Sequence, residues 1–256
     1  MNTRQHTCRE TPRAQGIDDV GVLLGVWAHP DDEAYLSAGL MAMARAVGNR
    51  VVVATATKGE MGTDDPEAFS TERLAQIRER ETAASMAALC VREHRWLGHS
   101  DGRLDPTSAR GIQQVCALID EVRPDTIVTF GPDGMTGHPD HRAVYRWATA
   151  AWMKTGQASR LWYATVTPEF HRDWGEVNAE VGLWLGGTTP PSEPACELAY
   201  AIRCDGQILD RKYAALRAHA SQTSALIERL GRERYRQWWS AESFVDATKH
   251  ARSLAA

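Results

Sequence analysis

Two short stretches of the chain carry the residue types that metal-assisted hydrolysis requires. Residues 29–33 read HPDDE and residues 138–141 read HPDH, with more than a hundred residues between them. Imidazole nitrogens and carboxylate oxygens bind catalytic divalent ions, and three such ligands leave a position open for water. The ion lowers the pKa of bound water to about 7, and a nearby carboxylate takes its proton. The two stretches therefore predict a hydrolytic metal site, provided that the fold brings them together.

The residues within these stretches divide into candidate metal ligands and candidate acid–base or oxyanion-stabilising residues. The ligands available are His29, Asp32 and His141. This choice leaves Asp31 and His138 close to the ion without binding it. One of them can take a proton from the attacking water, and the other can stabilise an oxyanion or protonate a leaving nitrogen.

A purely structural interpretation of the same residues exists. Asp32 and Glu33 precede an apolar helical pattern, where acidic side chains favour a helix start. Pro30 and Pro139 suit turns that lead into helices. Because two such turns each follow a predicted strand, we favour the functional interpretation.

The elements that must position these turns alternate between strand and helix. Apolar runs predict strands at 20–28, 50–57, 94–97, 126–130, 161–167 and 198–203, and helical spacing predicts helices at 33–47, 71–89, 108–122, 141–154, 209–218 and 223–239. This alternation predicts an α/β fold: a three-layer, Rossmann-like, mostly parallel sheet with helices on both faces. The carboxyl ends of parallel strands share one edge, so the turns after the first and fourth strands would meet there.

The predicted domain organisation is simple. Residues 1–18 are polar and unpatterned, which favours a flexible tail, and residues 19–256 form a single domain. Residues 168–195 are rich in glycine and proline, and we expect an irregular lid there. Trp174 and Trp184 lie in this region and are candidates for stacking on a sugar or an aromatic group.

Composition excludes several classes of partner. The chain is 43% hydrophobic and 24% charged, with a formal net charge of −4, so no basic face for nucleic acid is expected. Neither a secretory signal nor an apolar run of membrane-spanning length is visible, which predicts a cytoplasmic protein. A homo-oligomer is compatible with the sequence.

The two stretches and several others resemble the PIG-L/LmbE-like zinc-dependent N-acetylglucosaminyl deacetylases. The matching segments are AHPDDE at 28–33, TKGEMG at 57–62, RERE at 78–81, LGHSDG at 97–102, GHPDH at 137–141 and Lys212 with HASQ at 219–222. The resemblance extends from about residue 21 to 245. It implies a hydrolase that acts on carbon–nitrogen bonds of linear amides.

The resemblance also implies residue roles. His29, Asp32 and His141 would hold Zn²⁺, with Fe²⁺ or another divalent ion as an alternative. Asp31 would be the general base, and His138 would stabilise the tetrahedral intermediate or act as an acid.

Outside this group the implied roles are supporting ones. Asp140 would orient His138 or a ligand histidine. Arg78 would bind substrate hydroxyls or a phosphate, unless it is an ordinary surface arginine of its helix. His219 would belong to the substrate site or its surroundings, although a capping or packing histidine fits its position equally well.

One position departs from the pattern. Relatives that make mycothiol place a tyrosine two residues before the first histidine of the second motif, and this chain has Thr136 there. The difference weakens the case for a mycothiol precursor as substrate and leaves the reaction class unchanged.

The resulting hypothesis is removal of the N-acetyl group from an N-acetylglucosaminyl moiety of a small glycoconjugate. Possible carriers are an inositol, a thiol-cofactor precursor, a glycolipid or a glycosylated natural product, and Thr136 together with the expected lid favours the last, such as a glycopeptide antibiotic intermediate. The alternatives are an amidase for a longer acyl group or a thiol conjugate of the mycothiol or bacillithiol type, and a non-catalytic sugar-binding module. A non-haem iron oxygenase shares the ligand set, but Asp31 beside the metal suits water activation better.

Overall fold

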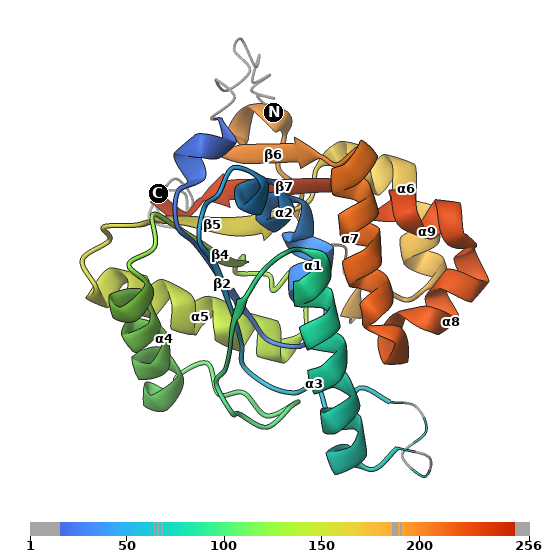
Figure 1. The fold of residues 1–256 in the computed structure, drawn as a ribbon, viewed down its shortest axis with the longest axis horizontal. Coiled ribbons are helices and arrows are strands. Elements are labelled where there is room, and N and C mark those ends of the chain that lie inside the picture. The colour runs from blue at the N-terminus through green and yellow to red at the C-terminus, as the bar shows by residue number, and fades with distance from the viewer. Residues whose placement is uncertain are drawn as a thin grey trace, which may run out of the picture.

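A seven-stranded sheet forms the centre of the protein (Figure 1). The structure is a computed structural model that describes residues 16–248, except 64, 66, 68, 186–188 and 190. The strands are β1 (Leu23–Trp27), β2 (Val51–Thr55), β3 (Glu93–Trp96), β4 (Thr126–Phe130), β5 (Arg160–Thr165), β6 (Tyr200–Arg203) and β7 (Ala241–Asp246). They are ordered β3-β2-β1-β4-β5-β7-β6 across the sheet.

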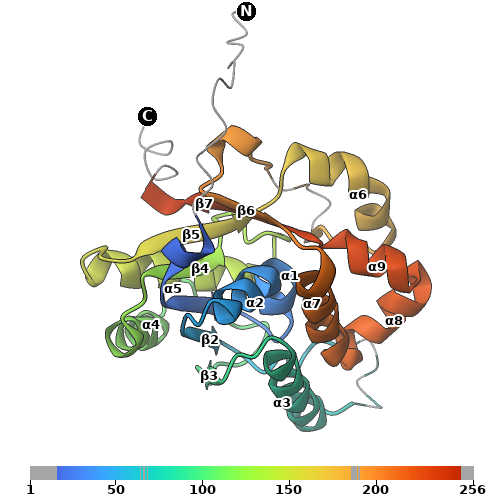
Figure 2. The same cartoon turned by 45° about the horizontal axis from the view of Figure 1, so that its top comes forward.

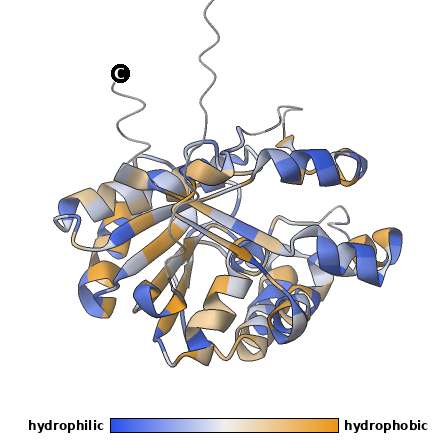
Figure 3. Cartoon of the chain, turned by 90° about the horizontal axis from the view of Figure 1, so that it is seen from above, coloured by the Kyte–Doolittle hydropathy of each residue, from blue (hydrophilic) through white to orange (hydrophobic). Residues whose placement is uncertain are grey.

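Helices cover this sheet on both sides. They are α1 (Asp32–Leu36), α2 (Ala38–Ala46), α3 (Thr71–Ala88), α4 (Ala109–Val122), α5 (Pro139–Lys154), α6 (Pro168–Glu180), α7 (Gly206–Ala218), α8 (Ala220–Leu230) and α9 (Arg232–Trp238), with short 3₁₀ helices at Ile17–Val20 and Ala195–Glu197. Helix α7 packs against α2 and α3, whereas α4 packs against α5 as a separate pair (Figure 2). Hydrophobic residues are concentrated along the central strands, and the outlying helices carry many hydrophilic ones (Figure 3).

The parallel part of the sheet places the two motifs. Strands β3, β2, β1, β4 and β5 are parallel neighbours, and β1 lies directly beside β4. The chain moves outward from β1 to β3 and then returns to β4, so the strand order reverses between β1 and β4. Ligand sites of open α/β sheets lie at such a switch point, outside the carboxyl ends of the strands. The predicted α/β fold class is confirmed.

The far edge of the sheet was only partly predicted. Strand β7 pairs antiparallel with both β5 and β6 and separates them. It had no counterpart among the predicted strands. The predicted helix at 223–239 is two helices, because Gly231 takes a positive φ of 79° between α8 and α9.

The predicted helix at 33–47 is also divided, at Ser37. The backbone N–H groups of Gly39 and Leu40 donate to the two carboxylate oxygens of Glu242, at 2.7 and 2.9 Å. Lys212 donates to the same carboxylate at 2.5 Å, and both charged side chains are buried. A distant acidic residue therefore caps the second half of the segment as a helix of its own.

The region expected to be an irregular lid begins with a regular helix. Helix α6 (Pro168–Glu180) starts at a Pro in its first turn, and the Thr167 hydroxyl accepts from the backbone N–H of Phe170. Phe170 and Val177 are buried by this helix, which explains why it forms despite the surrounding glycines and prolines. The irregular backbone is confined to the later residues of the predicted lid.

Two other expectations concern the chain ends and membranes. Of the tail predicted at 1–18, residues 1–15 lie outside the described residues, and Ile17–Val20 is a 3₁₀ helix. None of the helices that the structure describes combines the length and apolar character needed to cross a membrane.

Candidate metal and active site

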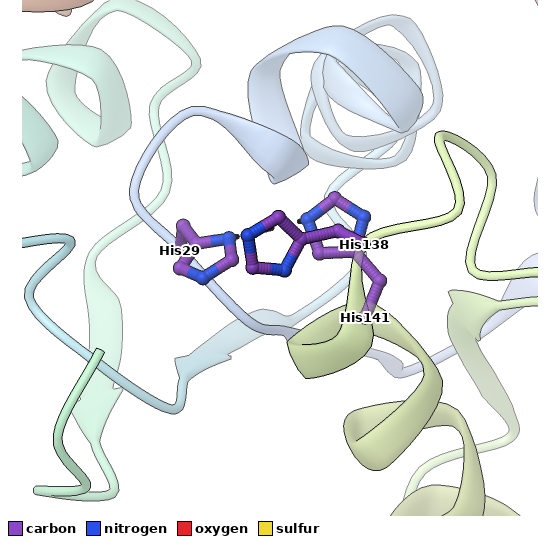
Figure 4. A group of neighbouring side chains, drawn as sticks. All are labelled: His29, His138 and His141. Carbon is purple, nitrogen blue, oxygen red and sulfur yellow. Dashed lines mark hydrogen bonds between the residues drawn. The ribbon is translucent and has the colours of Figure 1, made fainter. Parts of the chain in front are cut away.

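The two motifs meet at the carboxyl ends of β1 and β4. His29 follows β1, and His138 and His141 come from the first turn of α5, which follows β4 (Figure 4). The His29 Nδ1 and His141 Nε2 atoms lie 3.1 Å apart, although 112 residues separate them in sequence. The fold thus fulfils the condition on which the predicted site depends.

The carboxylate of Asp32 lies close to both predicted histidine ligands. Asp32 Oδ1 lies 3.3 Å from His141 Nε2, and Asp32 Oδ2 lies 3.7 Å from His29 Nδ1. Ligand atoms at about 2.1 Å from zinc in a tetrahedron are separated by about 3.4 Å. Each pair of these side chains therefore brings donor atoms to about this spacing, although a different Asp32 oxygen faces each histidine.

The remaining ring nitrogens of both histidines are occupied. His141 Nδ1 lies 2.9 Å from the Gly134 carbonyl oxygen, which fixes the proton on Nδ1 and leaves Nε2 free to bind. The His141 ring also stacks on Phe130 at a centroid distance of 4.1 Å. His29 Nε2 contacts carboxylate oxygens of Asp101 and Asp140 at 3.0 and 3.3 Å. Each imidazole is thus oriented with one nitrogen toward the shared point.

The charges around this point favour a cation. Burial alone would raise the pKa of Asp32, but the imidazoles of His141 and His29 hold it well below its usual range. Burial also opposes protonation of His29, yet its hydrogen bonds to Asp101 and Asp140 raise its pKa to about 10. A group of anionic oxygens therefore surrounds the imidazoles, and a divalent ion is a natural counter-charge.

The Asp140 carboxylate contacts His29, one of the proposed ligands, and the backbone N–H of Asp140 donates to His138. Its carboxylate accepts the backbone N–H groups of Gly102 and Leu104 at 2.7 and 3.1 Å, and it contacts His29 Nε2. Such outer partners of metal-binding histidines hold the ring in place and increase its basicity.

Replacing Asp140 by Asn is expected to weaken metal binding by about 10–100-fold, because the amide lacks the charge that faces His29. Competition with a chromogenic chelator measures the affinity. Asp120→Asn, which changes an exposed residue of α4, is the matched control. Unchanged affinity in Asp140→Asn would refute this role.

Asp31 lies beside the proposed ligands and is held by Arg78. Arg78 Nη2 donates to Asp31 Oδ2 at 3.2 Å and to the Pro30 carbonyl at 2.5 Å, while Nη1 donates to the Gly59 carbonyl at 2.8 Å. Burial raises the pKa of Asp31 to about 6, and Arg78 opposes that rise. Arg78 is buried rather than exposed on its helix, so the surface interpretation of this residue is wrong.

His138 faces the cavity from the N-terminus of α5. Its Nδ1 accepts the backbone N–H of Asp140 at 3.1 Å, so a neutral His138 carries its proton on Nε2. Its ring lies edge-to-face against His29, with centroids 4.7 Å apart. An Nε2–H group is thereby available to a bound oxygen.

A cavity of about 450 Å³ connects these residues, and its wall has two chemically different parts. The polar part contains the proposed ligands together with Asp31, Arg78, Asp101, Thr136 and His138. The apolar part contains Met61, Met135, Val181, Leu183, Leu226, Trp238 and Trp239. The size suits a sugar with one further small group.

The tryptophans proposed for stacking are not in this wall. Among the described residues that line the cavity, neither Trp174 nor Trp184 occurs, and Trp184 instead packs near His171 at a ring distance of 5.8 Å. Trp238 and Trp239 occupy the wall. Sequence reasoning missed them because they lie at the end of the long helix predicted at 223–239, with no motif around them.

Sequence reasoning also assigned no role to Asp101. This residue follows β3 within the segment LGHSDG, and it lies at the same carboxyl edge as the motifs. Its position after a parallel strand was the signal that could have identified it. His219, by contrast, is fully buried outside the cavity lining, where its Nε2 lies 3.0 Å from Glu33 Oε1.

Known proteins resemble this chain in both sequence and fold. The 1D-myo-inositol 2-acetamido-2-deoxy-alpha-D-glucopyranoside deacetylase of Saccharomonospora viridis is 33% identical over 233 residues, covering 78% of this chain and 84% of the relative. The N,N'-diacetylchitobiose deacetylase from Pyrococcus horikoshii has a similar fold, with a TM-score of 0.60 and 21% identity over 90% of this chain and 85% of that one. A deacetylase triple mutant of the teicoplanin biosynthetic pathway has a TM-score of 0.63 and 18% identity over 88% and 98% of the two chains.

The family assignment covers the part of the chain that contains the site. Residues 24–152 match the family described as PIG-L: GlcNAc-PI de-N-acetylase. This range includes both motifs, Arg78 and Asp101. The chain belongs to the PIG-L family.

Proposed function

We propose that the protein is a zinc-dependent N-deacetylase that hydrolyses the acetamide of an N-acetylglucosaminyl group attached to inositol. The observation that carries the reaction class is the convergence of His29 Nδ1, His141 Nε2 and the Asp32 carboxylate, with Asp31 lining the same cavity. Three ligands and an adjacent carboxylate are what hydrolysis of an unactivated amide needs.

A divalent ion bound by these three residues would supply a water of lowered pKa and a Lewis acid for the acetamide carbonyl. Asp31 accepts the proton of the attacking water, and Arg78 holds its carboxylate in position. His138 donates from Nε2 to the oxygen on which negative charge develops, or to the leaving nitrogen. The apolar wall limits the access of other water to the reacting carbonyl.

The choice of substrate rests on the relatives. The relative from Saccharomonospora viridis, whose printed name specifies an inositol-linked acetamido sugar, is 33% identical over most of both chains. The teicoplanin-pathway deacetylase is only 18% identical, and this level of similarity supports the fold alone. We therefore favour the inositol-linked sugar over the antibiotic intermediate that Thr136 and the expected lid favoured.

Thr136 does not oppose this choice. It lies in the cavity wall, with Oγ1 3.4 Å from His141 Nδ1. His138 is a further donor on the same wall, so stabilisation of the intermediate does not depend on a tyrosine at position 136.

A substrate panel tests the proposal. Zinc-loaded protein is incubated with N-acetylglucosaminyl-inositol, methyl N-acetylglucosaminide, a glycopeptide carrying the same sugar, and N-butanoyl versions of each, and free amine and acetate are measured. We expect the highest kcat/KM with the acetylated inositol conjugate. A preference for the butanoyl compounds would support the longer-acyl amidase instead, and no amine release from any compound would refute the deacetylase.

A further inference from the structure

The backbone of the proposed base is held in an unfavourable conformation. Asp31 has φ of 99° and ψ of −29°, which is rare for a residue other than glycine. Such a conformation persists only when surrounding contacts enforce it. The side chain of Asp31 is held by Arg78, so a second contact must hold its backbone.

That contact comes from Glu33. The backbone N–H of Asp31 donates to Glu33 Oε2 at 3.1 Å. Glu33 is fully buried, so water cannot stabilise its carboxylate. The other oxygen, Oε1, lies 3.0 Å from His219 Nε2 and accepts from the Ser85 hydroxyl at 3.4 Å. Glu33 thus links the Asp31 backbone to His219, which lies 186 residues after Glu33 in the sequence.

His219 is placed to fix this carboxylate. It lies at the junction of α7 and α8, where its carbonyl accepts the backbone N–H groups of Gln222 and Thr223 at 2.9 and 3.0 Å. Its Nδ1 has no hydrogen-bond partner among the described residues, so the proton of a neutral imidazole belongs on Nε2, facing Glu33. Neither Glu33 nor His219 is among the described residues that line the cavity.

We propose that Glu33 and His219 are a pair of positioning residues: His219 fixes the Glu33 carboxylate, and Glu33 holds the backbone of Asp31 so that its side chain faces the reacting water. This inference rests on the proposed function for the role of Asp31. Arg78 acts on the side chain and Glu33 acts on the backbone, so the base is held from two sides. Among the described residues, neither the Glu33 side chain nor the His219 side chain forms a hydrogen bond with a proposed metal ligand.

The first test compares two substitutions of His219. His219→Gln keeps an N–H group that can donate to Glu33, and we expect its kcat to stay close to that of the wild type. His219→Phe removes the donor, and we expect kcat to fall about tenfold with KM and zinc content unchanged. Trp152→Phe is the control, because it deletes a buried hydrogen bond to the Ser159 carbonyl far from the cavity. It should lower the melting temperature without changing kcat.

A double-mutant cycle separates positioning from general destabilisation. In the Asp31→Asn background the base is already lost, so His219→Phe should lower kcat less than about twofold further. An equal fall of kcat in both backgrounds would overturn the proposal, as would an unchanged kcat in His219→Phe. If His219→Phe does not fold, Glu33→Gln and Glu33→Met provide the same comparison, since Gln retains an acceptor for the Asp31 N–H and Met does not.

A measurement on the metal-free protein does not depend on activity. We expect the Asp31 amide hydrogen to be protected from exchange in the wild type and to exchange at least about tenfold faster in His219→Phe. Equal exchange rates would overturn the inference. If the wild type hydrolyses no amide while the exchange result holds, the proposed function fails and the positioning contact stands.

Discussion

Asp31→Asn is expected to lower kcat by at least about 100-fold while the zinc content stays at the wild-type level. The amide has the shape of the carboxylate but cannot accept a proton from water. Asn also tolerates a positive φ, so the backbone at this position should be preserved. Its side-chain oxygen can still accept from Arg78, which keeps the neighbouring contacts intact.

Steady-state kinetics with the inositol conjugate and metal analysis of the same samples measure this effect. Asp210→Asn, which changes an exposed carboxylate bound to Arg236 on the outside of α7, is the control for loss of one negative charge. Activity of Asp31→Asn within a few-fold of the wild type would remove Asp31 from its role as base.

His141→Ala is expected to abolish both zinc binding and turnover. The substitution removes Nε2, which lies 3.1 Å from His29 Nδ1 and 3.3 Å from Asp32 Oδ1, so only two of the three ligands remain. It also removes the ring that stacks on Phe130. We expect the loss in affinity to exceed the roughly 10–100-fold that follows removal of an outer partner such as Asp140.

Elemental analysis after dialysis against a low zinc concentration measures the remaining metal, and circular dichroism checks the fold. His171→Ala, on α6 and outside the described cavity lining, is the matched histidine control and should retain zinc. Full zinc occupancy in His141→Ala would contradict the ligand assignment.

The central part of the fold could be predicted because it depends on local pattern. Apolar runs followed by helical spacing identify β1, β2 and β4, and the parallel arrangement then places the residues after β1 and β4 at one edge of the sheet. His29 and His141 meet because β1 also pairs directly with β4, a neighbour relation that the local pattern does not specify. Contacts between distant residues leave no local signal.

Helix α2 and strand β7, which lies between β5 and β6, illustrate this limit. The helix predicted at 33–47 is interrupted because Glu242, about 200 residues later, binds the backbone of Gly39 and Leu40. Strand β7 contains Glu242 among its buried residues. It lies in the antiparallel part of the sheet, where the alternation of strand and helix does not help to predict a strand.

The substrate that the sequence favoured, an antibiotic intermediate, rested on too few observations. One missing tyrosine at position 136 and a glycine-rich region favoured an antibiotic intermediate, yet part of that region is helix α6. The relatives named for the inositol-linked sugar include the Saccharomonospora viridis protein at 33% identity. A single side chain in a cavity wall is weak evidence about a substrate when other donors line the same wall.

The two-part wall of the cavity has an evolutionary consequence. Every residue that we assign to the metal or to the reacting atoms precedes residue 152, whereas Leu183, Leu226, Trp238 and Trp239 come from the later third of the chain. Substitutions at these four wall positions can change which substrates fit the cavity while the residues assigned to the reaction stay the same. Related enzymes could in this way evolve different substrate specificities while retaining the same reaction.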